Sequence, residues 1–408
     1  MNQFKTLYIY ELKKICMRKI VWITVGILML LTVYMGAGVP LSTIQSVTIG
    51  DETVEMSGLE YIANEKKNAE SLTGREIDDT LLQEVQNAYQ ISEEPSVVAG
   101  QDKSDKIEAM AQRREQYKAV YSWIYYVMRD YEAVHTIDEE TLYQTRLINL
   151  NDSWTEQRMA EEEKAYWMEK ENAIEKPLVY GYSGGWNSIL EEFLTLNFML
   201  ILTIAICLSN VFSEEHLRKT DQLILCSRNG KSLLFYAKIA AGITFGTCCA
   251  VLFLLLAMVS TLSVYGAEGF HVALQVYLPI CSLDMTVGQA VLLMSLVYMI
   301  AAVFCSAVAL FLSEALRNST AVMGILTGGM IVTMLVEIPA QYRLLSQIYG
   351  LLPTVLLRAW QLWDNRLVKI FGVFFTNFQI ASILYLMLGA VLVFLGNRIY
   401  KNYQVSGR

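Results

Sequence analysis

Six apolar stretches constrain this chain more than any other feature, because each approaches the roughly 20 residues that a helix needs to cross a bilayer. They cover 20–38, 193–212, 239–264, 290–312, 321–336 and 376–395. Backbone groups in lipid must be satisfied within the protein, so helices are the expected spanning form. The 408 residues are 54% hydrophobic and 18% charged, which favours the membrane class. We therefore predict an all-α integral membrane protein with six transmembrane helices, the first of them an uncleaved anchor.

The distribution of basic residues predicts which ends of these helices face the cytoplasm. Four segments together hold 14 Lys and Arg against 5 Asp and Glu, namely 1–19, 213–238, 313–320 and 396–408. All four lie on one side of a six-helix arrangement, and short cytoplasmic segments carry such a positive excess. We expect a multi-pass protein of the plasma membrane with both termini in the cytoplasm. Its first segment would be an amphipathic interfacial helix, and its last a cytoplasmic tail.

The opposite side would carry segment 39–186, which has 29 Asp and Glu against 14 Lys and Arg and contains no cysteine. Its length is sufficient for a core of its own. Three Thr or Ser residues precede a Glu by three positions, as in a capping box, and predict helix starts. They are Thr73, Thr136 and Ser153, followed by Glu76, Glu139 and Glu156. We therefore predict a helical, acidic extracellular domain between the first two spans, whose charge is most simply a solvated surface.

Two further patterns concern the outer surface and helix packing. Segment 337–375 is too apolar for a free loop, and Pro353 interrupts it, which suits short interfacial or re-entrant outer helices. The third and fifth spans contain G-x-x-x-G, at Gly242–Gly246 and Gly324–Gly328. This spacing permits close approach of two helices.

Few residues could carry chemistry. The three histidines, His135, His216 and His271, lie in separate segments without a metal-binding motif. Gly230–Lys231–Ser232 resembles the end of a phosphate-binding loop, but Leu225 stands where that loop needs its first glycine. The sequence thus predicts no metal and no other cofactor in this chain, no enzymatic activity of its own and no nucleic-acid partner.

The segment 213–238, between the second and third spans, is more elaborate than a connector needs. It contains paired acids, an apolar patch and several basic residues, as the stretch 212–225 (FSEEHLRKTDQLIL) shows. One interpretation is a surface helix on the inner leaflet, with its basic residues at lipid headgroups. The other is a short docking helix whose apolar ridge fits a groove on a soluble partner.

The order of these features resembles the membrane subunit of type-2 ABC exporters. The shared pattern is Phe-Ser-Glu-Glu after the second span, then Lys-Thr-Asp-Gln-Leu-Ile-Leu, Ser-Arg-Asn-Gly-Lys, and Ala-Lys-Ile opening the third span. Gly185–Trp186 before the second span resembles subfamilies with a large outer domain. The resemblance implies that 213–238 is a cytoplasmic coupling segment that docks on a separate ATPase. The implied docking residues are Glu214, Glu215, Leu223, Ile224, Leu225, Arg228 and Lys238.

The resemblance also implies partners and a transport path. Two copies of an ABC ATPase would bind ATP and Mg²⁺, and a second permease, either another copy of this chain or a sister chain, would complete the assembly in the lipid bilayer. A cargo such as an antimicrobial peptide, a lipid or a small toxin would contact polar groups of the spans. The candidates are Asn197, Thr203, Thr244 and Thr247.

Two other functions stay open. One is a membrane-anchored sensor or scaffold whose extracellular helical domain binds a ligand. The other is an intramembrane enzyme, which would need catalytic residues at bilayer depth, where this sequence has few ionisable groups.

Overall fold

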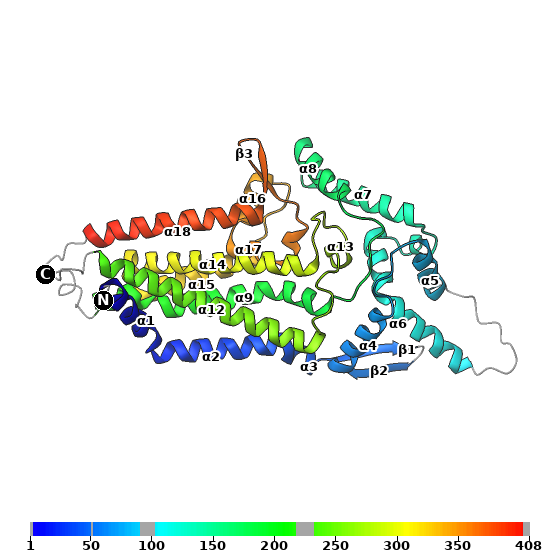
Figure 1. The fold of residues 1–408 in the computed structure, drawn as a ribbon, viewed down its shortest axis with the longest axis horizontal. Helices are drawn as coiled ribbons and strands as arrows, with labels where there is room; N and C mark the ends of the chain where they lie inside the picture. Colours follow the sequence, from blue (N-terminus) through cyan, green and yellow to red (C-terminus); the bar gives the residue numbers. More distant parts are fainter. Residues whose placement is uncertain (1–2, 50–51, 90–102, 218–231, 403–408) are drawn as a thin grey trace.

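The computed structural model describes residues 3–49, 52–89, 103–217 and 232–402, which form a long helical bundle with a separate layer at one end (Figure 1). We call that layer, residues 43–183, the distal layer, and the opposite end of the bundle the proximal end. Both α1 and the end of α18 lie at the proximal end (Figure 1). The bundle contains α1 (Gln3–Cys16), α2 (Lys19–Val33), α9 (Gly184–Leu208), α10 (Asn210–Leu217), α12 (Leu233–Tyr265), α14 (Val287–Leu316), α15 (Ser319–Leu335) and α18 (Asn377–Asn402).

Five helical stretches of the described residues are long and apolar enough to cross a membrane. They are Lys19–Ser42, Gly184–Glu215, Leu233–Tyr265, Val287–Leu316 and Asn377–Asn402. The first continues from α2 through a π-helical turn (Tyr34–Gly38) into α3 (Val39–Ser42). The predicted run 321–336 corresponds to α15, a shorter apolar helix of 17 residues. A mostly helical chain with several potential spans is thus confirmed, whereas the count of six stays a prediction.

The two G-x-x-x-G pairs have different environments. On α12, a Cβ built on Gly242 would lie 2.8 Å from a leucine side chain of α14, and one on Gly246 would overlap a serine hydroxyl of α14. A side chain at either position would push α12 and α14 apart. On α15, a Cβ on Gly324 or Gly328 would meet no described atom within 4 Å. The glycine face of α15 is therefore not packed against the described part of the chain.

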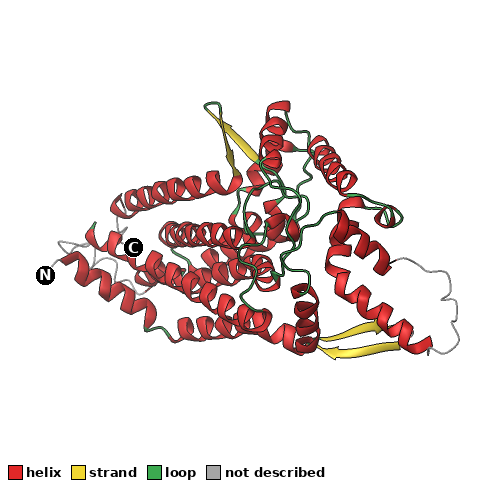
Figure 2. Cartoon of the chain, turned by 45° about the vertical axis from the view of Figure 1, so that its right-hand side comes forward, coloured by secondary structure: helices red, strands yellow, loops and turns green. Residues whose placement is uncertain are grey.

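The distal layer is mainly helical, as predicted, but it also contains an antiparallel hairpin (Figure 2). Its elements are β1 (Ile44–Ile49), β2 (Glu52–Ser57), α4 (Gly58–Glu70), α5 (Asp79–Tyr89), α6 (Lys103–Met128), the 3-10 turn η2 (Ala133–His135), α7 (Glu139–Glu156) and α8 (Glu161–Asn172). β-Branched residues in both strands, and the turn-forming pair Gly50–Asp51 between them in the sequence, favour this hairpin. The layer has a hydrophobic core of its own, which includes Val85, Trp123 and Val127.

Of the predicted helix starts in this layer, those at Thr73 and Ser153 are wrong, and the one at Thr136 lies two residues before the observed N-cap. The Thr73 hydroxyl donates to the carbonyl oxygen of Ala69 at the end of α4, and Ser153 lies inside α7. α7 begins at Glu139, but its N-cap is Asp138, whose carboxylate accepts from the Thr141 amide at 2.9 Å. Asp138 is adjacent to the first helical residue, so it reaches the free amides that Thr136 cannot.

A buried arginine fixes the distal layer to the bundle. Arg146 of α7 pairs with Glu171 of α8, and both side chains are buried. Its guanidinium also donates to the carbonyl oxygens of Pro279 at 2.6 Å and Cys281 at 3.0 Å. These carbonyls belong to segment 266–286, which connects α12 to α14 and includes α13 (Leu274–Tyr277). The distal layer therefore holds the connection between two bundle helices.

Two more contacts reach the same segment. Trp123 Nε1 of α6 donates to the carbonyl oxygen of Gln275 at 2.8 Å. Lys66 of α4 lies 2.7 Å from Glu268, and its hydrogen bond lowers the pKa of that carboxyl. This pair is partly exposed, so it orients the surfaces more than it stabilises them.

The segment between α15 and α18 contains the predicted short helices and an unpredicted hairpin. Its elements are α16 (Arg343–Gly350), α17 (Pro353–Leu356), the 3-10 turn η3 (Ala359–Leu362), β3 (Leu367–Ile370) and β4 (Val373–Thr376). It also contacts α8, since Trp167 Nε1 donates to the Asn365 carbonyl oxygen at 3.0 Å and Arg343 lies 3.0 Å from Glu163. The distal layer thus contacts both long distal connections of the bundle.

The charge distribution predicts opposite accessibility for the two ends. Glu161→Cys on α8 and Thr320→Cys at the proximal start of α15 would each be made in a variant that lacks the seven native cysteines. An impermeant maleimide should label position 161 in intact cells and position 320 only after permeabilisation, because basic segments stay inside. The reverse labelling pattern would contradict this orientation.

Candidate functional site

Three helices meet at the proximal end, where the sequence predicts a coupling segment. α10 ends at Leu217 and α12 begins at Leu233, so these helices lead into and out of residues 218–231. α1 packs against α12 (Figure 1), and its Lys14 pairs with Glu215 of α10. Among the predicted docking residues, Glu214, Glu215 and Lys238 are described. Leu223, Ile224, Leu225 and Arg228 lie outside the described residues.

The Lys238 ammonium is the centre of this site. Lys238 is completely buried in α12, and its Nζ lies 2.9 Å from Glu11 Oε2 of α1 and 2.7 Å from Glu215 Oε1 of α10. It also donates to the Val211 carbonyl oxygen at 3.3 Å. An ammonium has three protons, and these three acceptors account for them. The ring of Phe212, with its centroid 5.6 Å away, provides a cation–π contact. A single lysine thus joins α1, α10 and α12.

A second set of ion pairs surrounds this centre. Lys14 Nζ lies 3.3 Å from Glu215, and Arg18 lies 2.6 Å from Glu214. Arg18 also donates to the carbonyl oxygens of Cys207 and Asn210. Cys207 lies at the C-terminal end of α9, where the helix dipole favours cations. We call the whole set the proximal charge network. Its members are Glu11, Lys14, Arg18, Glu214, Glu215 and Lys238.

Among the described residues the network contains three acids and three bases, so their formal charges balance. Balance matters because an unpaired charge at a buried site costs several kcal/mol, on the order of the stability of a whole domain. Ser313 of α14 extends the junction, since its hydroxyl donates to the Ser209 carbonyl oxygen at 2.7 Å and accepts from the Phe212 amide at 3.2 Å. Displacement of α10 would therefore disturb α1, α12 and α14 together.

The predicted transport-path residues lie at different depths. Asn197 and Thr203 of α9 are buried, and their side chains donate to the carbonyl oxygens of Pro353 at 2.9 Å and Met199 at 2.8 Å. Thr244 of α12 accepts from the Tyr8 hydroxyl at 3.1 Å, and Thr247 is half-buried one turn further along α12. Asn197 contacts a distal segment whereas Thr244 contacts α1. Their role in a transport path stays a prediction.

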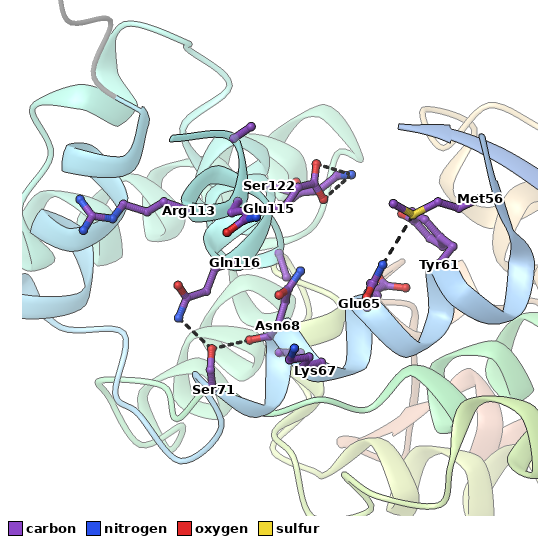
Figure 3. A pocket seen from close by; sticks show the side chains of 16 residues that line it. Met56, Tyr61, Glu65, Lys67, Asn68, Ser71, Arg113, Glu115, Gln116 and Ser122 are labelled. Atoms are coloured by element: carbon purple, nitrogen blue, oxygen red, sulfur yellow. Dashed lines mark hydrogen bonds and ion pairs between the residues drawn. The ribbon is translucent and has the colours of Figure 1, made fainter. Parts of the chain in front are cut away.

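A groove of about 900 Å³ lies in the distal layer between α4 and α6 (Figure 3). Amide side chains at i, i+4 spacing line both walls, Asn64 and Asn68 on α4, Gln112 and Gln116 on α6. Basic and acidic residues alternate around them, namely Lys67, Arg113 and Lys118 with Glu65 and Glu115. This lining suits a polar ligand without a large net charge.

No protein-family model, curated protein or solved structure matches this chain. Within the described ranges, no group of three or more His, Cys, Asp or Glu side chains is placed to hold a metal ion. The proximal charge network and the groove are the two features from which a function can be inferred.

Sequence reasoning missed that the N-terminal segment supplies half of the network, namely Glu11 and Lys14 of α1 and Arg18 after it. Glu11 is the only acid among residues 1–19, which contain five Lys and Arg. A helix that only binds anionic headgroups gains nothing from such an acid. Glu11 was therefore the available signal for an internal cation partner. The burial of Lys238 also means that it positions the helix ends and is not itself a docking surface in this conformation.

Lys238→Met should destabilise the protein, because it leaves Glu11 buried without its cation. Removing one partner of a buried ion pair costs about 3–5 kcal/mol. The double variant Lys238→Met with Glu11→Gln should recover most of this loss, since Glu215 keeps Lys14 at 3.3 Å. Thermal unfolding of the protein in nanodiscs measures both variants.

The matched control is Lys118→Met, which removes an exposed ion pair of α6 with Glu115. Such a pair contributes only about 0–1 kcal/mol. Equal destabilisation by the single and double variants of the network would show that charge balance does not stabilise this junction.

Proposed function

We propose that this chain is the permease subunit of an ATP-driven ABC exporter, which moves a substrate outward with a separate ATPase chain. The observation that supports it is the proximal charge network. This network surrounds the two helix ends that lead into residues 218–231, and those residues carry the resemblance to a coupling segment. The protein would lie in the plasma membrane with both termini in the cytoplasm.

In this proposal the network converts a push on the coupling segment into helix motion. α1 and α10 are each joined to α12 by a buried ion pair with Lys238, and separating them would leave charge uncompensated. The three helices would therefore move as one unit. Closure of two ATPase subunits around ATP would displace this unit and bias the bundle between inward-open and outward-open states. ATP and Mg²⁺ would be bound by the ATPase, and this chain would supply the mechanical response.

A second permease would complete the assembly. The unpacked glycine face of α15, with Gly324 and Gly328, suits the close approach of another helix. Either a second copy of this chain or a sister permease could provide that helix. The cargo would be a small amphiphile such as an antimicrobial peptide, a lipid or a small toxin.

The double variant Leu223→Asp with Leu225→Asp should abolish co-purification of the ATPase. Two unpaired carboxylates in a desolvated contact cost several kcal/mol, enough to break a modest docking interface. Membrane abundance should be unchanged, because both positions lie in the polar segment between two spans. The measurement is affinity purification of the tagged chain from its native membranes, followed by assay of ATP hydrolysis in the eluate.

Glu161→Gln is the matched control, since its side chain is 90% exposed on α8 of the distal layer. Its partner, Lys164, lies on the same helix, whereas Glu162 and Glu163 are unsuitable because they pair with Lys369 and Arg343 of the segment between α15 and α18. Retention of the ATPase by the double variant would leave 218–231 as a surface segment at the inner leaflet and remove the proposed coupling.

The groove favours a second candidate function, in which the distal layer is an extracellular receptor for a polar ligand. Ala119→Trp would fill the groove from α6, whereas Ala63→Trp adds the same side chain on α4 outside the groove lining. Hydrogen–deuterium exchange with a defined set of short peptides and oligosaccharides should show protection of 61–71 and 111–122. Protection should be lost in the first variant and kept in the second. Absence of protection with every probe would contradict the receptor function.

A further inference from the structure

The tip of the β3–β4 hairpin exposes an apolar cluster. Phe371 is 102% exposed relative to a free residue, and its neighbours Ile370 and Val373 are 38% and 57% exposed. Ile370 pairs with Val373, so Phe371 and Gly372 form a two-residue turn. Three apolar side chains therefore project from the end of one short hairpin.

The backbone at this tip is unfavourable for phenylalanine. Phe371 has φ of 50° and Gly372 has φ of 84°, as in the primed turns that favour Asn, Asp or Gly at the first position. A residue with a bulky side chain in this region costs about 1–2 kcal/mol. Asn at position 371 would form the same turn with less strain and better hydration. The phenyl ring contributes nothing to packing within the described chain, so its contribution lies elsewhere.

The base of the hairpin is anchored in the distal layer. Leu367 is buried in a cluster with Trp154 and Trp167. Lys369 pairs with Glu162 of α8, and its Nζ lies 5.3 Å from the centroid of the Phe374 ring. The hairpin is thus fixed at its base and free at its apolar end.

The position of the hairpin identifies what could cover this end. β4 ends at Thr376 and α18, an apolar helix able to span a membrane, begins at Asn377. In both views the hairpin projects outward from the bundle at the distal end of α18, and its tip leans toward the proximal end (Figures 1 and 2). α16, which hydrogen-bonds to β3 through Gln347, exposes Leu344 and Ile348 beside it. Exposed apolar side chains are therefore present on the hairpin tip, on α16 beside it and on α18, which follows it in the chain.

We propose that the hairpin tip inserts into the outer leaflet of the bilayer, with Phe371 at the boundary between headgroups and acyl chains. Aromatic side chains favour this boundary, and burial there compensates the strain of the turn. The insertion would set the height of the distal layer above the membrane through the Lys369–Glu162 contact and the buried Leu367. The proposal requires α18 to span the membrane and does not depend on transport activity.

Spin labels can measure the depth of the tip. A nitroxide at Phe371→Cys, in a cysteine-free variant in nanodiscs of phosphatidylcholine and phosphatidylglycerol, should collide more often with oxygen than with a water-soluble nickel chelate. The same label at Glu161→Cys on α8 should show the opposite preference. The first label replaces the phenyl ring, so a second label is placed at Val373→Cys. It is measured in two backgrounds, one with Phe371 intact and one with Phe371→Asn. The oxygen-to-nickel collision ratio at position 373 should fall several-fold in the Asn variant.

Each outcome is decisive. Dominant nickel collisions at positions 371 and 373 would place the tip in water and overturn the proposal. Protection from both reagents would place it against protein and overturn it as well. An unchanged ratio at position 373 in the Phe371→Asn variant would show that the phenyl ring is not the anchor. Thermal unfolding of that variant verifies that the Asn-Gly turn keeps the hairpin folded.

Discussion

The proximal half of the molecule depends on the ion pairs that the Lys238 ammonium makes with Glu11 and Glu215. A lysine that is completely buried next to apolar helices is tolerated only with full hydrogen bonding and compensating charge. Glu11 and Glu215 provide that compensation from two other helices, and this requirement fixes where α1 and α10 can lie. The N-terminal helix is therefore part of the bundle junction as well as an amphipathic helix suited to an interface. The burial of one charge thus determines the arrangement of three helices.

Patterns that are local in sequence predicted the fold well. Five of the six apolar runs correspond to helices long enough to span, because apolar length alone specifies such a helix. The acidic segment 39–186 is mainly helical and has its own core, in keeping with its composition. Helix starts were less predictable. Capping depends on which polar side chain reaches the free amides, and Asp138 lies closer to the start of α7 than Thr136 does.

Long-range contacts were beyond sequence reasoning. Glu11 and Lys238 are separated by 227 positions, and no local period connects them. The same holds for Arg146, which reaches the carbonyl oxygens of Pro279 and Cys281 from another layer. The two hairpins were missed because a strand of four to six residues gains its stability from a partner strand. Of the candidate site, the sequence indicated the helix ends with Glu214, Glu215 and Lys238, but not the N-terminal residues Glu11, Lys14 and Arg18 that pair with them.

α12 connects the two fixed regions of the molecule. Lys238 holds its proximal end, and the segment that follows its distal end is held by Arg146 and Trp123. A helix of 33 residues is about 50 Å long and resists compression, so motion at one end reaches the other. Close packing at Gly242 and Gly246 makes α14 follow α12. The distal layer is thus joined to the same helix that carries Lys238. If a displacement of residues 218–231 moves α12, the contacts of Arg146 with the carbonyl oxygens of Pro279 and Cys281 must strain or shift.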